Sequence, residues 1–114
     1  MRVRYTPEAI ADLEEIQGYI RDQLKNPRAA KRISKAILNA CGRLAQFPNA
    51  GMLFQEKTGY ESDLRVLFCE NYLAAYRVEE KTVSVARILD ARQDYCALLF
   101  AEGGKEEAAS TEAT

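Results

Sequence analysis

The side chains with the greatest potential for chemistry lie in the second half of the chain, in and just after segments rich in β-branched and aromatic residues. They are Arg65, Arg77, Arg87, Arg92, Asp94 and Tyr95. An arginine in a strand most often points into solvent. If adjacent strands instead gather arginines over one face of a sheet, the forked donors of their guanidinium groups form a clamp for phosphate or carboxylate. The spacing allows both arrangements.

The groups that most enzymes use for acid–base and metal chemistry are missing. The chain has no histidine, no Gly-rich phosphate loop and no serine beside a plausible base. Cys41, Cys69 and Cys96 are an odd number without a C-x-x-C spacing, which argues against a disulfide framework and a Cys/His zinc site. We therefore expect small buried thiols, no metal, no cofactor and no metabolic reaction.

Three predicted strands carry these arginines. Residues 64–69, 72–78 and 82–89 are β-branched and aromatic, and polar turns of hairpin length separate them. They predict an antiparallel meander. The stretch before them, 47–61, is rich in Pro, Gly and Asn and predicts a connection. The final stretch, 93–100, fits either a helical turn or a further strand.

Two helices are predicted ahead of the meander, after a short strand at 2–5 in which charged and apolar residues alternate. Each helix begins at a polar N-cap followed by proline, at Thr6-Pro7 and at Asn26-Pro27, and the first runs to about Lys25. Apolar residues recur at helical spacing on one side of each helix. They are Ile10, Leu13, Ile16, Ile20 and Leu24 in the first, and Ala30, Ile33, Ile37, Ala40, Cys41, Leu44 and Phe47 in the second. The pair predicts an αα-hairpin.

The polar side of the second helix is basic. No acidic residue occurs between Asp22 and Glu56, and the basic residues of the helix fall on the arc opposite its apolar stripe. They are Arg28, Lys31, Arg32 and Lys35. Such a face is either simply solvated or a surface that meets an acidic partner.

The length of 114 residues and the hydrophobic content of 47% suit one modest core. Residues 1–5 have no signal-like apolar region, and no stretch approaches the ~20 apolar residues needed to cross a bilayer. We expect one cytoplasmic domain over residues 1–100 that does not enter a membrane. Residues 101–114 contain no large apolar side chain, so we expect a disordered tail. Without that tail the chain has 15 basic and 13 acidic residues.

Several motifs, taken in order, resemble the ParE branch of the RelE/ParE toxin superfamily over roughly residues 3 to 96. Those of the helical half are Tyr5-Thr6-Pro7-Glu8-Ala9, Asn26-Pro27-Arg28-Ala29-Ala30 and Leu44-Ala45-Gln46-Phe47-Pro48-Asn49-Ala50-Gly51. Those of the strand half are Leu64-Arg65-Val66, Asn71-Tyr72-Leu73-Ala74-Ala75-Tyr76-Arg77-Val78, Val83-Ser84-Val85-Ala86-Arg87-Ile88-Leu89 and Arg92-Gln93-Asp94-Tyr95. The resemblance implies an α+β fold: an N-terminal strand and an antiparallel helical hairpin packed on a small twisted antiparallel sheet.

The resemblance also implies a partner and a target. Members of the family are held inactive by an antitoxin encoded beside them, here a ParD-like protein whose C-terminal segment would wrap the toxin. ParE-like toxins act on DNA gyrase, and we expect direct nucleic-acid contact only through the antitoxin complex. The residues expected to bind antitoxin or target are Arg28, Lys31, Arg32, Lys35, Arg65, Tyr76, Arg87, Arg92 and Tyr95.

Two alternatives stay open. RelE-like relatives cleave messenger RNA on the ribosome, and Arg65, Arg87 and Tyr95 lie at or near the positions that would perform that reaction. Many relatives carry histidine where this chain has Asp90, and a carboxylate there would repel a phosphate. The small basic excess is also weak for binding ribosomal RNA. The second alternative is an interaction domain without toxicity.

Overall fold

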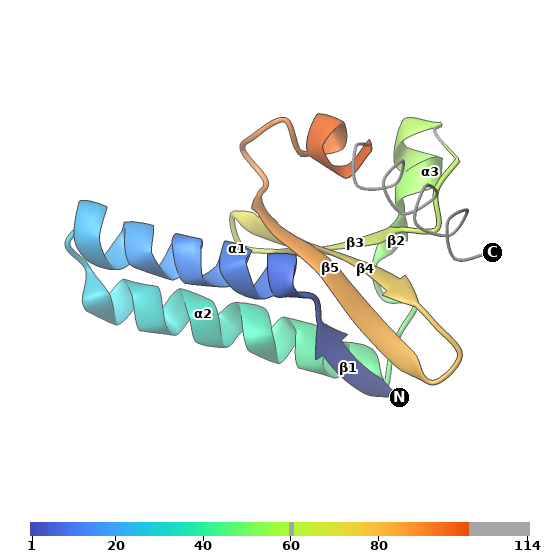
Figure 1. The fold of residues 1–114 in the computed structure, drawn as a ribbon, viewed down its shortest axis with the longest axis horizontal. Coiled ribbons are helices and arrows are strands. Elements are labelled where there is room, and N and C mark those ends of the chain that lie inside the picture. Colours follow the sequence, from blue (N-terminus) through green and yellow to red (C-terminus); the bar gives the residue numbers. More distant parts are fainter. Residues whose placement is uncertain (60, 101–114) are drawn as a thin grey trace.

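The computed structural model describes residues 1–59 and 61–100 (Figure 1). Residues 101–114, predicted to be a disordered tail, lie outside the described residues. The first half of the chain forms β1 (Arg2–Tyr5), α1 (Pro7–Gly18) and α2 (Pro27–Gly42). A π-helical turn at Tyr19–Gln23 extends α1, and a 3-10 turn at Arg43–Ala45 extends α2. Within the described part of the chain, no helix is long and apolar enough to cross a membrane.

The two helices begin where the sequence predicts. Thr6 accepts a hydrogen bond from the Ala9 amide at 3.1 Å, and Asn26 accepts one from the Ala29 amide at the same distance. A proline follows each cap, where its missing N–H costs no helical hydrogen bond. At the junction Lys25 adopts a left-handed conformation with φ of 52°. The helices therefore form the predicted hairpin.

The second half of the chain forms the predicted meander of β3 (Arg65–Cys69), β4 (Tyr72–Val78) and β5 (Thr82–Asp90). The complete sheet has the order β1-β5-β4-β3-β2. The three strands of the meander are antiparallel, as predicted, and β1 pairs with β5 in parallel, so the complete sheet is mixed. Alternation within a strand marks its buried face but specifies neither its neighbour nor its direction.

Two short elements occupy the segment predicted as a connection. They are β2 (Met52–Leu53), which pairs with β3, and α3 (Phe54–Thr58), which ends at Gly59 with φ of 80°. A strand of two residues and a helix of five are too short to produce a periodic signal. Residues 95–100 are helical, which decides between the two predicted alternatives for that stretch.

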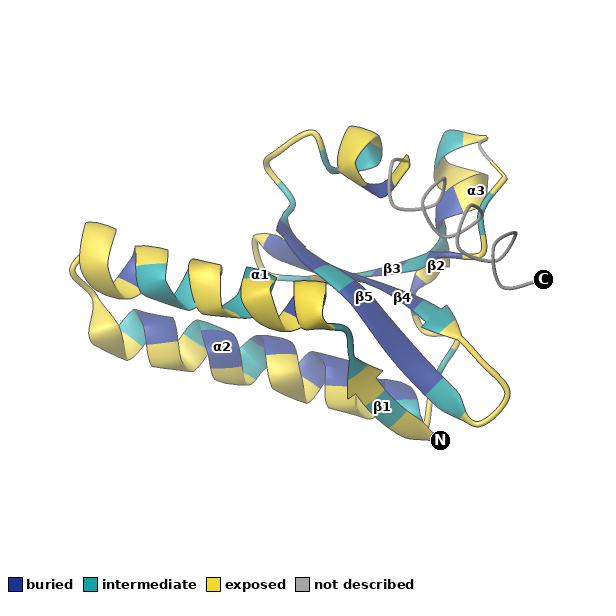
Figure 2. Cartoon of the chain, viewed as in Figure 1, coloured by how far each residue is buried: buried dark blue, intermediate teal, exposed yellow. Residues whose placement is uncertain are grey.

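Two small cores lie on opposite faces of the sheet, and most of β4 and β5, which lie between them, is buried (Figure 2). The helical hairpin covers one face, where Ile37, Leu44 and Tyr76 are buried. On the other face Phe54 of α3 and Leu99 pack against the strands. Three residues of the predicted apolar stripes are exposed: Ile10 is 49% exposed, Leu24 56% and Phe47 61%.

Candidate functional site

The basic side of α2 is exposed, as its position opposite the apolar stripe predicts. Arg28, Lys31, Arg32 and Lys35 all lie on this surface, which we call the α2 basic face. Arg32 pairs with Glu70 of the β3–β4 turn at 3.1 Å. The other three form no ion pair with the described residues. Three cations are therefore available to an acidic partner. The same exposure would be seen if the α2 basic face were simply solvated.

Tyr76 and Arg65 hold the loop that follows α2, and their partners are main-chain atoms. The Tyr76 hydroxyl donates to the Pro48 carbonyl at 2.7 Å and accepts from the Gly51 amide at 2.8 Å. Arg65 donates to the carbonyls of Gly51 at 2.8 Å and Asn49 at 3.4 Å. Tyr76 is fully buried, and burial raises the pKa of its hydroxyl. Tyr76 was predicted to contact a partner; in this structure its hydroxyl is buried and holds the loop.

Gly51 is fixed in the same loop by the closeness of its neighbours. A Cβ atom at this position would lie 2.7 Å from the Val66 carbonyl oxygen and 2.8 Å from the Tyr76 hydroxyl. Both distances are shorter than non-bonded atoms tolerate, and one neighbour is main chain. The Phe-Pro-Asn-Ala-Gly motif is therefore explained by packing of the loop against β3 and β4.

Arg87 of β5 is paired with a carboxylate of α1. Its guanidinium donates to both carboxylate oxygens of Asp12, at 2.7 and 3.0 Å, and Asp12 also accepts from the Ile88 amide at 2.9 Å. Since β1 ends at Tyr5, the edge of β5 beyond that point has no strand beside it, and Asp12 satisfies one of its amides. The Asp12 and Arg87 side chains are only 12% and 25% exposed. The charge of Arg87 is therefore balanced inside the fold.

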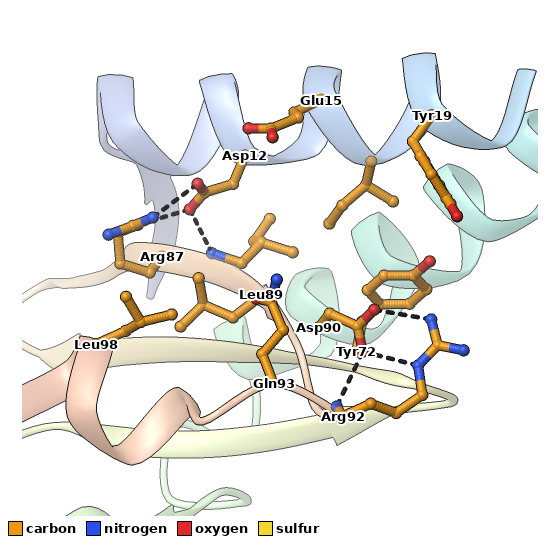
Figure 3. A pocket seen from close by; sticks show the side chains of 12 residues that line it. Asp12, Glu15, Tyr19, Tyr72, Arg87, Leu89, Asp90, Arg92, Gln93 and Leu98 are labelled. Carbon is orange, nitrogen blue, oxygen red and sulfur yellow. Dashed lines mark hydrogen bonds and ion pairs between the residues drawn. The ribbon is translucent and has the colours of Figure 1, made fainter. Parts of the chain in front are cut away.

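A groove of about 590 Å³ runs between α1, the end of β5 and the segment that follows β5 (Figure 3). Tyr19 and Tyr72 line one end of it, next to Asp90 and Arg92, which pair at 2.7 Å. The hydrogen bond from Arg92 lowers the pKa of Asp90. Asp90 is therefore ionised at neutral pH, and this end of the groove holds an ion pair.

Tyr95 belongs to a different cluster, on the face of the sheet that α3 covers. Its ring meets that of Phe68 edge-on, with centroids 6.0 Å apart. The ammonium of Lys57 lies 5.7 Å from the Tyr95 centroid and 5.8 Å from that of Phe68, and the interaction with Tyr95 raises the pKa of Lys57. The groove is lined by Arg87 but by neither Arg65 nor Tyr95. The structure thus gives each of the three a separate set of neighbours.

Of the two arrangements that the spacing of the strand arginines allows, the clamp is not formed, because each arginine has partners of its own. Arg77 bonds Asp63 at 3.0 Å, Arg92 bonds Asp90, Arg87 bonds Asp12, and Arg65 bonds carbonyls. Asp12 and Lys57 were not predicted as site residues, because the residues next to them in the sequence do not distinguish them from ordinary solvated charges. Asp12 precedes Leu13 of the apolar stripe, and this sequence position could have indicated that its side chain is half-buried.

Comparison with known proteins fits this geometry. The model of the family described as ParE toxin of the type II toxin-antitoxin system, parDE, matches residues 3–95. The chain belongs to the ParE toxin family. A solved structure described as a chromosomal ParDE TA system from P. aeruginosa superimposes with a TM-score of 0.68 at 26% identity, covering 81% of this chain and 97% of that one. No curated protein sequence matches. The family resemblance and the α+β fold predicted from the motifs are confirmed.

Proposed function

We propose that this ParE-family protein is a cytoplasmic toxin that arrests bacterial growth by binding DNA gyrase and is neutralised by a cognate ParD-like antitoxin. The observation that carries the proposal is the family match over residues 3–95, which includes both helices and the whole meander. The similar P. aeruginosa structure is of a toxin-antitoxin system, and that supports a protein partner for this chain.

The α2 basic face supplies the physical basis for antitoxin binding. Arg28, Lys31 and Lys35 form no ion pair with described residues, and like charges gathered on one helix face repel each other until a partner neutralises them. A disordered acidic segment that folds on this face would gain charge-assisted contacts, and electrostatic attraction would speed the encounter. Arg92, which is exposed and paired with Asp90 in the groove, is a further proposed contact.

Gyrase inhibition is favoured over RNA cleavage because the candidate nuclease residues are engaged elsewhere. Arg87 is neutralised by Asp12, and Arg65 donates to main-chain carbonyls. Phosphoryl chemistry needs cationic groups that converge on one phosphate, together with an acid and a base. The other arginine that lines the groove, Arg92, is likewise paired with a carboxylate, that of Asp90. Binding to a protein target requires none of these groups to be free.

A supercoiling assay tests the proposal. Purified chain added to DNA gyrase and relaxed plasmid is expected to inhibit supercoiling, and prior addition of the protein from the neighbouring reading frame is expected to restore it. Full supercoiling at saturating chain, with rapid cleavage of a translated message, would support the RelE-like alternative. Normal growth on induction in a bacterium would instead support a non-toxic interaction domain.

A further inference from the structure

The outer edge of β3 is only half covered. β2 pairs with β3 at Arg65 and Val66 and begins at Met52, so no strand of the described residues lies beside the remainder of β3 on that side. The Leu64 carbonyl accepts from the Phe54 amide on this side. Because main-chain groups of an antiparallel strand alternate in direction, the amide and carbonyl of Phe68 point the same way as those of Leu64. Within the described residues no hydrogen bond reaches them there.

An apolar hollow of about 160 Å³ opens beside this free edge. It is lined by the end of α2, the loop held by Tyr76 and the free part of β3, and its residues are Ala40, Arg43, Leu44, Phe47, Ala50, Leu67 and Phe68. The Phe47 side chain is 61% exposed and that of Phe68 44%. Exposed aromatic rings beside an unpaired strand edge are a surface that proteins usually cover.

Two cationic side chains that form no ion pair with the described residues flank the free edge, one on each face of the sheet. Arg43 lines the hollow, and Lys57 lies over the rings of Phe68 and Tyr95 on the opposite face. Neither forms an ion pair with the described residues. Successive side chains of an added strand point to opposite faces, so one such strand reaches both cations.

From this arrangement we infer that the free edge of β3 is a docking site for an extended acidic segment of a protein partner, which pairs with the main chain of Phe68 and inserts one apolar side chain into the hollow. A carboxylate next to that apolar residue points to the opposite face and meets Lys57, and a carboxylate two positions away lies on the face of the hollow and meets Arg43. The inference rests on the proposed function, because the antitoxin is the partner expected to supply such a segment. It concerns a surface separate from the α2 basic face.

Charge decides against a second copy of this chain as the occupant. In a symmetric pairing about Phe68, Arg43 and Lys57 of one copy would face the same cations of the other. Like charges brought together at an interface cost affinity. An acidic segment has the opposite effect, since it supplies the carboxylates that both cations lack.

Proline at position 68 tests the pairing, because it removes only the outward-facing N–H and leaves the hydrogen bonds to β4 intact. We would compare Phe68→Pro with Phe68→Ala, which loses the same ring and keeps the N–H. The probe is the full-length antitoxin from the neighbouring reading frame. We expect Phe68→Pro to bind about tenfold more weakly than Phe68→Ala, the effect of one lost main-chain hydrogen bond. Thermal unfolding of both variants checks that the fold survives.

Charge reversal and hydrogen exchange test the same site without proline. Arg43→Glu is expected to weaken antitoxin binding about tenfold or more, whereas the matched reversal Lys81→Glu, in the distant β4–β5 turn, is expected to have little effect. In the wild-type protein the Phe68 amide should exchange quickly when free and slowly in the complex.

The outcomes separate the inference from the proposed function. If the complex forms and neutralises the toxin, but the Phe68 amide still exchanges quickly and Arg43→Glu binds like wild type, the docking site is wrong and the proposed function stands. If the wild-type chain binds no antitoxin, both fail. A chain that dimerises alone, and loses its dimer on Phe68→Pro, would assign the edge to self-association and overturn the inference.

Discussion

Replacing Tyr76 by phenylalanine removes a single oxygen atom from the centre of the fold and leaves the ring in place. The hydroxyl is the donor to the Pro48 carbonyl and the acceptor for the Gly51 amide. Both partners sit in the loop between α2 and β2, which Arg65 also holds through the Gly51 carbonyl. The substitution therefore tests whether this tyrosine acts through the loop or through a partner protein.

The cost follows from the two groups that lose their partner. Gly51 is buried, and leaving a buried amide without a partner costs about 1–3 kcal/mol. Pro48 is partly exposed, so water compensates part of the loss at its carbonyl. Together we expect Tyr76→Phe to lower the free energy of unfolding by about 2–4 kcal/mol, a large part of the ~5–15 kcal/mol typical of a domain.

Urea unfolding of the purified chain, followed by far-ultraviolet circular dichroism, measures this loss. With a denaturant slope of about 1–2 kcal/mol/M for a protein of this size, the midpoint should fall by more than about 1 M. Tyr19→Phe is the matched control, because the Tyr19 side chain is 53% exposed, and it should change stability by less than about 0.5 kcal/mol. Equal stability of Tyr76→Phe and wild type would refute the assigned role.

Three further changes are expected to alter the stability of the fold. Gly51→Ala forces a Cβ against the Val66 carbonyl and should destabilise the fold by about 2 kcal/mol or more in thermal unfolding, and an unchanged midpoint would contradict the packing. Asp12→Ala removes the partner of both Arg87 and the Ile88 amide and should lower the free energy of unfolding by about 2–3 kcal/mol. Asp12→Asn keeps an acceptor for that amide and should lower it by less. Equal losses in the two variants would reject the amide contact. Burial raises the pKa of the Cys41 thiol from 9.0 to about 11. The free energy of unfolding should therefore decline as the pH rises from about 9 towards 11, because only the unfolded chain ionises this group in that range. Cys41→Ala should flatten the decline, and a decline as steep as in wild type would contradict the burial of the thiol.

The elements that the sequence predicts well are those specified by neighbouring residues. Thr6-Pro7 and Asn26-Pro27 mark both helix starts because a cap needs only an acceptor and the next few amides. The Glu70-Asn71 turn and the apolar runs beside it define the β3–β4 hairpin in the same local way. These signals account for the helical hairpin and the meander.

The elements that the sequence does not predict depend on residues far apart in the chain. β1 pairs with β5 across about eighty positions, and Asp12 pairs with Arg87 across 75. No local pattern encodes either contact. Tyr76 was predicted as a contact for a partner, and only its burial and its bonds to the loop show that it supports the fold.

The candidate site was predicted in part for the same reason. The α2 basic face follows from helical periodicity, so its exposure could be predicted. The free edge of β3 could not, because it exists only where β2 stops short, and that depends on the loop held by Tyr76 and Arg65.

The effect of the chain on DNA supercoiling inside cells distinguishes gyrase inhibition from RNA cleavage. A reporter plasmid would be recovered within minutes of inducing the chain alone, or together with the neighbouring reading frame, and resolved on a chloroquine gel while message integrity is followed on a northern blot. We expect the plasmid to lose negative supercoils while messages stay intact, and co-expression of the neighbour to prevent this loss. Cleaved messages with normal plasmid supercoiling would contradict it.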